Sequence, residues 1–220
     1  PWVVDNKLQL DDECKKFIDL AKSMYDNGYV VKDLAQWSTD WYAAGQTDST
    51  MGYFVSTWGF GNSILTQAAG GEGGATYGKW KVVVGPQPFY WGGTWICGAN
   101  GTDNKSLVKD IIEKMTTDES VLKDIVSKDN DYANNSKLMD SLKDDKSFGD
   151  KALGGQNPVP IFSAGVGNID MSNISSYDQT CAEEFQAAMK DYFDGNTKDY
   201  DTALQTFIDK VKTKHPEIEG

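Results

Sequence analysis

The stretch SSYDQTCAEEFQAAMKDYFDGNTKDYDTALQTFIDKVKTK, residues 175–214, carries the clearest structural signal in the sequence. Its first half places apolar residues on one helix face, three and four positions apart: Cys181, Phe185, Ala188, Met189 and Tyr192. Its second half repeats this spacing with Ala203, Leu204, Phe207, Ile208 and Val211. Gly195 and Pro216 end the two segments, because glycine favours helix ends and proline cannot continue a helix. The stretch therefore predicts two consecutive amphipathic helices, over 175–194 and 200–214.

The same periodicity predicts further helices upstream. They cover 11–27, 60–69, 105–115, 119–127 and 135–143, with a short helical or irregular piece at 37–45. Asp118 and Asn134 are the expected caps of the helices at 119 and 135. Aromatic and β-branched residues predict strands at 51–55, 79–84 and 94–99, and residues 149–172, rich in glycine and with little periodicity, predict an extended crossover. Helices alternating with short strands indicate an α/β fold.

Composition excludes several partners. The 220 residues allow one large domain or two smaller lobes. The net charge is −12 and the chain has no arginine, which argues against nucleic acids and other polyanions. The longest apolar runs, such as the one around Val82 to Val84, are far shorter than the ~20 residues of a membrane-spanning helix.

Few residues suggest catalysis or metal binding. Cys14, Cys97 and Cys181 are odd in number and far apart, and two of them lie at apolar helix positions, which favours buried free thiols over disulfides or a metal site. The single histidine, His215, is followed by Pro216 near the C-terminus, a poor setting for a nucleophilic triad. We therefore expect no catalytic residue, metal or cofactor.

Tryptophan is concentrated in one part of the chain: Trp37, Trp41, Trp58, Trp80, Trp91 and Trp95. Trp80, inside a predicted strand, is expected to be a core residue. Trp58 beside Gly59, and Trp91 and Trp95 on either side of Gly92-Gly93, lie where flexible backbone meets a regular element. An indole face covers the C–H face of a sugar ring, while nearby amides and carboxylates accept its hydroxyls. The cluster predicts binding of a neutral sugar, although such clusters also mark protein interfaces.

Several short motifs, in this order, resemble family 1 extracellular solute-binding proteins, the maltose-binding-protein-like components of ABC importers. The similarity spans nearly the whole chain and rests on Gly45, Met51, Trp58, Gly78-Lys79-Trp80, Val82 to Pro86, Trp91-Gly92-Gly93, Thr102 to Leu107, Tyr177-Asp178-Gln179, Gly195 and Ala203.

The resemblance implies a type II periplasmic-binding-protein-like fold, in which two α/β lobes close around a sugar. Residues 1–84 and 150–220 would then belong to the C-terminal lobe, and residues 85–149 to the N-terminal lobe. Because the chain is about half as long as the family's usual one, we expect it to be the C-terminal part of a longer protein.

The resemblance also implies a site and partners. Trp58, the loop Trp91-Gly92-Gly93 with Trp95, and Tyr177 with Asp178 match ligand-side positions, and Trp37 and Trp41 complete the candidate set. The ligand would be a sugar or oligosaccharide, and the partner an ABC permease. No catalysis is implied. The location would be extracellular, cell-surface-attached or periplasmic, with a lipid anchor on the preceding N-terminal part as the only membrane attachment.

Two other functions stay open at this point. A non-transport carbohydrate-binding or adhesion module would keep the aromatic face without closure of two lobes. A glycoside-active enzyme, or its remnant, would need two carboxylates about 5 to 9.5 Å apart across the cleft. The candidates near the tryptophans are Asp40, Asp48, Glu72 and Asp178.

Overall fold

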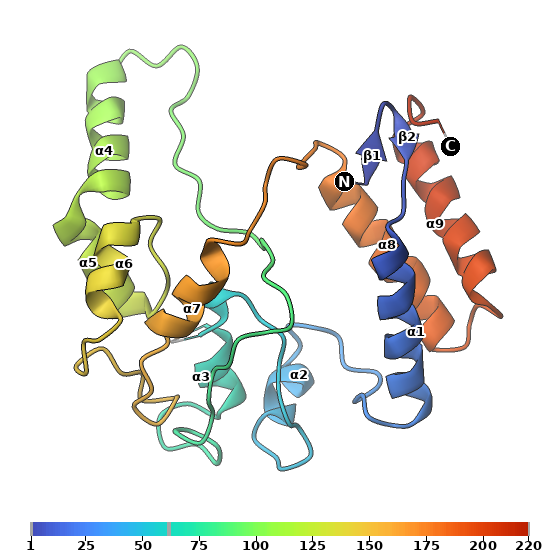
Figure 1. Ribbon diagram of the computed structural model, residues 1–220, viewed down its shortest axis with the longest axis horizontal. Helices are drawn as coiled ribbons and strands as arrows, with labels where there is room; N and C mark the ends of the chain where they lie inside the picture. The colour runs from blue at the N-terminus through green and yellow to red at the C-terminus, as the bar shows by residue number, and fades with distance from the viewer. Residues whose placement is uncertain (1, 61–62, 220) are drawn as a thin grey trace. The chain divides into compact units, whose positions relative to one another are not determined.

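The computed structural model describes residues 2–60 and 63–219. The chain forms two compact units. The terminal unit combines residues 1–33 with residues 170–220, and the central unit comprises residues 34–169 (Figure 1). The first and last segments of the chain therefore fold together.

The terminal unit begins with a small hairpin of β1 (Val3–Val4) and β2 (Lys7–Leu8), in which Val3 lies opposite Leu8. Its two-residue loop is Asp5-Asn6, with φ angles of +49° and +59°. Positive φ at both central residues is the signature of a type I′ turn, and aspartate and asparagine tolerate it better than most residues. The periodicity argument did not predict this hairpin, because its strands are only two residues long.

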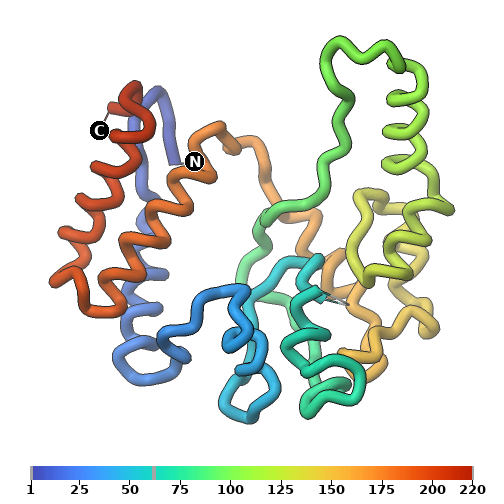
Figure 2. Tube along the Cα trace, turned by 180° about the vertical axis from the view of Figure 1, so that it is seen from behind, coloured from blue at the N-terminus to red at the C-terminus, as the bar shows by residue number. Residues whose placement is uncertain are grey.

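Three helices complete the terminal unit: α1 (Asp12–Asp26), α8 (Asp178–Phe193) and α9 (Tyr200–Lys214). They run side by side in Figures 1 and 2, with α8 in contact with both α1 and α9. The predicted helices at 11–27, 175–194 and 200–214 are confirmed, although α8 begins three residues later than expected. Their apolar faces form one core with Ile18, Cys181, Phe185, Ala188, Met189, Ala203, Phe207, Val211 and Ile218.

Polar contacts hold the last two helices together. Gly195, at φ +80°, ends α8 as predicted, and the Asp199 carboxylate caps α9 by accepting a hydrogen bond from Thr202 N at 2.8 Å. The Lys214 ammonium lies 2.6 Å from the Glu184 carboxylate, whose side chain is only 14% exposed, and its hydrogen bond lowers the pKa of Glu184. Beside the hairpin, Leu8 N donates to Glu219 O at 3.1 Å.

The described part of the central unit is helical and irregular. Its elements are α2 (Thr39–Ala44), the 3-10 helix η1 (Thr57–Gly59), α3 (Ile64–Ala68), α4 (Lys105–Thr117), α5 (Glu119–Asp129), α6 (Ser136–Leu142) and α7 (Val159–Val166). These positions confirm the predicted helices at 37–45, 105–115, 119–127 and 135–143. The prediction at 60–69 is confirmed over α3, and its residues 61 and 62 lie outside the described residues.

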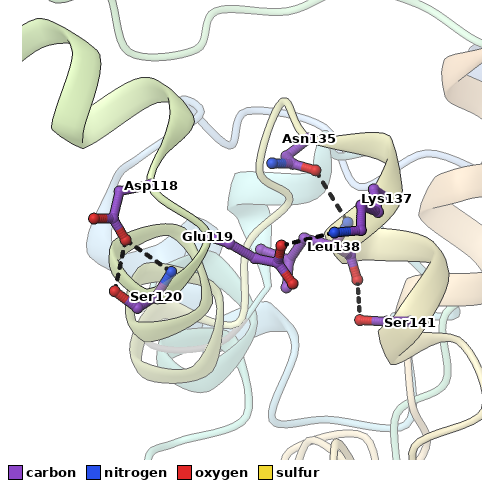
Figure 3. Close-up of polar contacts among 7 residues, drawn as sticks. All are labelled: Asp118, Glu119, Ser120, Asn135, Lys137, Leu138 and Ser141. Atoms are coloured by element: carbon purple, nitrogen blue, oxygen red, sulfur yellow. Dashed lines mark hydrogen bonds and ion pairs between the residues drawn. The ribbon is translucent and has the colours of Figure 1, made fainter.

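Side-chain caps define α5 and α6 (Figure 3). Asp118 accepts from Ser120 N at 2.9 Å, as predicted for the start of α5. Asn135, rather than the expected Asn134, accepts from Leu138 N at 3.0 Å and caps α6. The prediction was wrong by one residue. Both asparagines precede α6, and Asn135 is the one directly before its first residue, Ser136. Lys137 also donates to Glu119 at 3.3 Å, which joins the starts of the two helices.

The predicted strands at 51–55, 79–84 and 94–99 do not form among the described residues, where β1 and β2 are the only strands. A strand needs a neighbouring strand to bond its backbone, and sequence pattern does not show whether one is present. At Val82 a side chain takes that role: Val82 N donates to Gln156 Oε1 and Gln156 Nε2 donates to Val82 O, both at 2.9 Å. The described residues are therefore mostly helical, with one small sheet.

The predicted extended crossover at 149–172 is wrong in its middle, where α7 lies. This segment contains Pro158 and Pro160. They stand at the start of α7, where the missing N–H costs nothing and the fixed φ favours a helix. Val159 and Phe162 of α7 are buried in the two apolar clusters of the central unit.

All three cysteines are free thiols, as predicted. Cys181 is fully buried in α8 and Cys14 is half-buried in α1. The expected burial is wrong for Cys97, which is exposed because it lies in irregular chain rather than on the apolar face of a helix. Burial raises the pKa of the Cys14 and Cys181 thiols, so both stay protonated and behave as small apolar groups.

Candidate ligand-binding site

Four of the predicted site residues lie together in the central unit. The Trp37 ring is 5.4 Å from Trp41, 5.8 Å from Trp58 and 6.1 Å from Trp91 between centroids, and it stacks on Trp58 at an interplanar angle of 28°. Trp58 and Trp91 meet edge to face at 5.0 Å. These separations are those of favourable aromatic contacts. We call Trp37, Trp41, Trp58 and Trp91 the tryptophan cluster.

The cluster is assembled from three segments that lack long regular elements. Trp37 precedes α2 and Trp41 lies within it, Trp58 lies in η1, and Trp91 lies in irregular chain. The Ser38 hydroxyl caps α2 by accepting from Trp41 N at 3.1 Å, which fixes the turn between Trp37 and Trp41. Side-chain packing, rather than a continuous helix or sheet, therefore holds the four rings together.

One hydrogen bond fixes the position of Trp91 relative to Trp58. The Trp58 indole Nε1 donates to the Trp91 carbonyl oxygen at 2.8 Å. The next residue, Gly92, has a φ of +75°, and a Cβ atom there would lie 3.6 Å from Trp58 Nε1. Gly93 follows at φ +106°. The predicted glycine pair thus lets the chain turn sharply beside Trp58.

A second line of rings extends from Trp41 into the core. Tyr53 lies 4.8 Å from Trp41 and 5.7 Å from Trp80, and its hydroxyl donates to the Trp41 carbonyl at 2.9 Å. Burial raises the pKa of Tyr53, which keeps the phenol protonated as this donor. Trp80 packs against the apolar cluster around Phe162, in agreement with its predicted core role. Sequence reasoning missed Tyr53, because it interpreted residues 51–55 as a strand.

Gly45 controls how closely α2 approaches α3. A Cβ atom at Gly45 would lie 2.7 Å from the Ala68 carbonyl oxygen and 2.8 Å from the Tyr53 hydroxyl. Real Cβ atoms do not approach other atoms so closely. The carbonyl of Gly45 also accepts from Thr76 Oγ1 at 2.7 Å. The absence of a side chain at Gly45 is therefore what allows Tyr53 to support the cluster.

Trp37 has an unusual backbone conformation. Its φ is +73°, and the other described non-glycine residues with positive φ are all aspartate or asparagine: Asp5, Asn6, Asp33 and Asn130. For a bulky residue the left-handed region is a genuine outlier and costs of order 1–3 kcal/mol. The side chain is also 44% exposed, so burial offsets only part of this cost. Trp37 presents an aromatic surface to solvent from a strained backbone.

The cluster retains free hydrogen-bond donors. Within the described part of the chain, the indole N–H groups of Trp37, Trp41 and Trp91 have no protein acceptor, whereas that of Trp58 is used by Trp91. An indole N–H is a donor only, and it suits a hydroxyl or carbonyl oxygen. The cluster therefore offers both apolar faces and unused donors.

Three predicted site residues are not part of the tryptophan cluster. Trp95, in the central unit, is 75% exposed and has no ring contact with another described residue. Tyr177 and Asp178 belong to the terminal unit, where they have structural roles. Asp178 accepts from Ser175 N at 2.9 Å and from Ser175 Oγ at 2.8 Å, and the Tyr177 ring meets His215 edge-on at 5.0 Å.

The carboxylates considered for a glycosidase have no special environment. Asp40 and Asp48 are exposed, and Glu72 makes only an exposed ion pair with Lys151 at 3.6 Å. Residues 2–60 and 63–219 contain no group of three or more histidine, cysteine, aspartate or glutamate side chains placed to hold a metal ion. None of the helices described in the structure is long and apolar enough to span a membrane.

The sequence matches the family of bacterial extracellular solute-binding proteins over residues 3–148, well over half of the 220 residues, and the chain belongs to this family. A comparison with curated proteins gives no match. The matched region includes the whole tryptophan cluster, and Tyr177 and Asp178 lie beyond it.

Family membership establishes the general role of the chain. Proteins of this family are generally non-enzymatic, bind solutes for transport and work with ABC transporters outside the cytoplasm. The family also supports a periplasmic-binding-protein-like fold. The resemblance inferred from the ordered motifs is confirmed at this level.

Proposed function

We propose that the protein captures a neutral sugar or oligosaccharide at the tryptophan cluster and delivers it to an ABC permease. Family membership supports solute binding, and the chemistry of the cluster supports the class of ligand. The exposed part of Trp37 offers a flat apolar face that matches the C–H face of a sugar ring. The free indole N–H groups of Trp41 and Trp91 supply donors for ring hydroxyls. The charge of −12 disfavours an anionic ligand.

The backbone of Trp37 is the observation that carries this proposal. A sequence selected only for stability would place glycine, asparagine or aspartate at φ +73°, as it does at the other left-handed positions. Strained residues that are retained tend to be found at ligand-binding and catalytic sites. A tryptophan that is both strained and half-exposed is better explained by ligand binding than by packing.

The proposal extends to the residues whose role is open. Gly92 and Gly93 shape the chain beside Trp58, Trp95 would join the ligand surface from the same segment, and Tyr177 with Asp178 would add polar contacts on ligand binding. Residues 1–84 and 150–220 would form one lobe and residues 85–149 would contribute to the other. A lipid anchor on a preceding segment would hold the protein at the cell surface.

Thermal unfolding of the protein with a panel of neutral mono- and oligosaccharides tests the proposal. A sugar that binds only the folded state raises the Tm. At a free sugar concentration a hundredfold above the Kd, the free energy of unfolding increases by about 2.7 kcal/mol. Trp58→Ala should abolish this shift, and Phe54→Ala is the matched control, because Phe54 is an exposed aromatic residue without a ring contact in the described chain.

Three results would count against the proposal. They are no shift with any sugar in the panel, an unchanged shift in Trp58→Ala, and conversion of the sugar to a product. Trp95→Ala, assayed in the same way, decides whether Trp95 belongs to the site. Scattering profiles that do not change on binding would favour an adhesion-type module without lobe closure.

A further inference from the structure

The turn that carries Trp58 is held by few hydrogen bonds of its own. Within η1, Gly59 N donates to Ser56 O at 2.9 Å. At its end, Phe60 N donates to Thr57 O at 3.3 Å. Ser56, the N-cap residue, makes no side-chain cap. Because a 3-10 helix of three residues is only weakly fixed by its own bonds, the direction of the Trp58 ring depends on contacts outside η1.

One of these contacts comes from a distant part of the central unit. Thr57, the first residue of η1, donates its hydroxyl hydrogen to Asp131 Oδ1 at 2.9 Å. The two residues are 74 positions apart in the sequence, and the bond is partly buried. A hydrogen bond to a carboxylate is stronger than one between neutral groups. The bond therefore fixes the residue that directly precedes Trp58.

Asp131 is itself held on both sides. Asn130, directly before it, ends α5 with a φ of +52°, a conformation that asparagine tolerates. Tyr132, directly after it, donates its backbone N–H to the same Oδ1 atom at 2.7 Å. The Tyr132 ring packs against both apolar clusters of the central unit. The Asp131 carboxylate is therefore a fixed acceptor rather than a mobile surface group.

An aromatic contact anchors the other end of η1. The Phe162 ring meets Tyr132 edge-on at 6.5 Å and lies 5.1 Å from Phe60, which directly follows η1. The end of η1 is thus held by an apolar contact, and its start is held by the hydroxyl bond. Trp58 stands between these two anchor points.

We propose that Asp131 is a positioning residue of the ligand-binding site, which sets the orientation of Trp58 through Thr57. Among the residues that the structure describes, Asp131 forms no salt bridge, so an ion pair does not account for its charge. The inference rests on the proposed binding of a sugar at the tryptophan cluster. Side chains that contact a ligand must be held to within about 0.5 Å by the residues behind them. Without the bond, η1 shifts and the Trp58 ring meets the sugar in a poorer geometry.

Two matched pairs of variants test this role. Thr57→Val removes the hydroxyl at nearly constant size, and Thr57→Ser keeps it. Asp131→Ala removes the acceptor, and Asp131→Asn keeps an oxygen atom there. The measurement is the Kd of the neutral sugar that gives the largest Tm shift. Thr57→Val and Asp131→Ala should each raise this Kd about tenfold, and the conservative variants should change it less than about twofold. The double variant should bind about as weakly as Asp131→Ala alone, because both changes break the same bond.

Fluorine NMR of the protein labelled with 5-fluorotryptophan reports the position of Trp58 without a ligand. Thr57→Val and Asp131→Ala should move the Trp58 resonance of the free protein, and Thr57→Ser should leave it in place. Asp118→Ala is the matched control. Its Oδ1 atom also accepts from a hydroxyl group and a backbone N–H, those of Ser120, but at the opposite end of α5. This variant should change neither the resonance nor the Kd.

An unmoved Trp58 resonance in Thr57→Val would overturn the inference, as would an equal effect of Asp118→Ala. A sugar that binds the wild type and Thr57→Val with the same Kd would also overturn it, and would leave the proposed function standing. Equal losses of affinity in Asp131→Asn and Asp131→Ala would mean that the charge acts on the ligand directly, against a positioning role. If no sugar binds the wild type, the proposed function fails, and the Trp58 resonance alone decides whether Asp131 positions η1.

Discussion

Each unit of the protein contains a triplet of aromatic rings, and the two triplets differ in what surrounds them. In the terminal unit, Trp2, Phe185 and Phe207 lie 5.3 to 5.7 Å apart. In the central unit, Trp37, Trp58 and Trp91 lie 5.0 to 6.1 Å apart. The ring separations alone do not distinguish a core from a binding site.

The supporting backbone does distinguish them. Phe185 and Phe207 are buried residues of two long helices, where the aromatic rings complete an apolar face. Trp37 and Trp91 stand on irregular chain, and Trp37 is half-exposed on a left-handed backbone. The first triplet is part of the core of the terminal unit, and we propose that the second serves ligand binding. This division leads to four predictions.

The largest effect is expected from Phe207→Ala. Phe207 is fully buried between α8, α9 and the Trp2 ring, so truncation removes apolar contact and leaves a cavity. The free energy of unfolding should fall by about 3–5 kcal/mol. Urea denaturation measures this loss, and Phe17→Ala, at an exposed phenylalanine of α1, should change it little. Equal losses in both variants would mean that the terminal unit does not rely on this core.

Gly45→Ala should destabilise the central unit by about 1–3 kcal/mol, because the new methyl group cannot fit beside Ala68 O and the Tyr53 hydroxyl. Gly52→Ala is the matched control, since a Cβ atom there meets nothing within 4 Å. Denaturation curves of the two variants give the difference. Equal stability would show that the α2–α3 contact is looser than the structure indicates.

Glu184→Gln should cost about 1 kcal/mol at neutral pH through the loss of the charge-assisted bond to Lys214. The pKa of Glu184 is lower in the folded protein, so its stabilisation is complete above the unfolded value of about 4.3 and disappears as pH falls through the folded value. The difference between wild type and variant should therefore vanish in acid. Glu183→Gln, at an exposed neighbour on the same helix, is the matched control for removing one charge from α8.

The smallest stability effect, within about 1 kcal/mol, is expected for Trp37→Asn, because relief of the left-handed strain offsets the lost ring contacts. Ligand binding should nevertheless be lost. Parallel measurements of denaturation and of sugar-induced Tm shifts separate the two effects. A large loss of stability would place Trp37 with the core aromatic residues instead.

The sequence allowed the helices to be predicted because their signals are local. The spacing of apolar residues predicted α8 and α9, and Gly195 and Asp118 indicated helix boundaries. These signals suffice because the backbone hydrogen bonds of a helix lie within the predicted segment itself. Residues 79–84 have strand composition, but a strand depends on a partner elsewhere in the chain. At Val82 the partner is the Gln156 side chain, which no local pattern indicates.

The candidate site could be predicted in part for the same reason. The density of tryptophan indicated Trp37, Trp41, Trp58 and Trp91, which the fold brings together. The contribution of Tyr53 depends on the space left by Gly45, and the φ of Trp37 depends on the turn into α2. Both are properties of packing between segments, so composition and periodicity did not show them.

Fluorine NMR of the protein labelled with 5-fluorotryptophan tests the division of the aromatic residues most directly. The seven tryptophans give separate resonances, which single Trp→Phe variants assign. On addition of a neutral oligosaccharide that raises the Tm, the resonances of Trp37, Trp58 and Trp91 should shift, while those of Trp2 and Trp80 stay in place. Shifts at Trp2 without shifts in the tryptophan cluster would contradict the assignment of the cluster as the binding site.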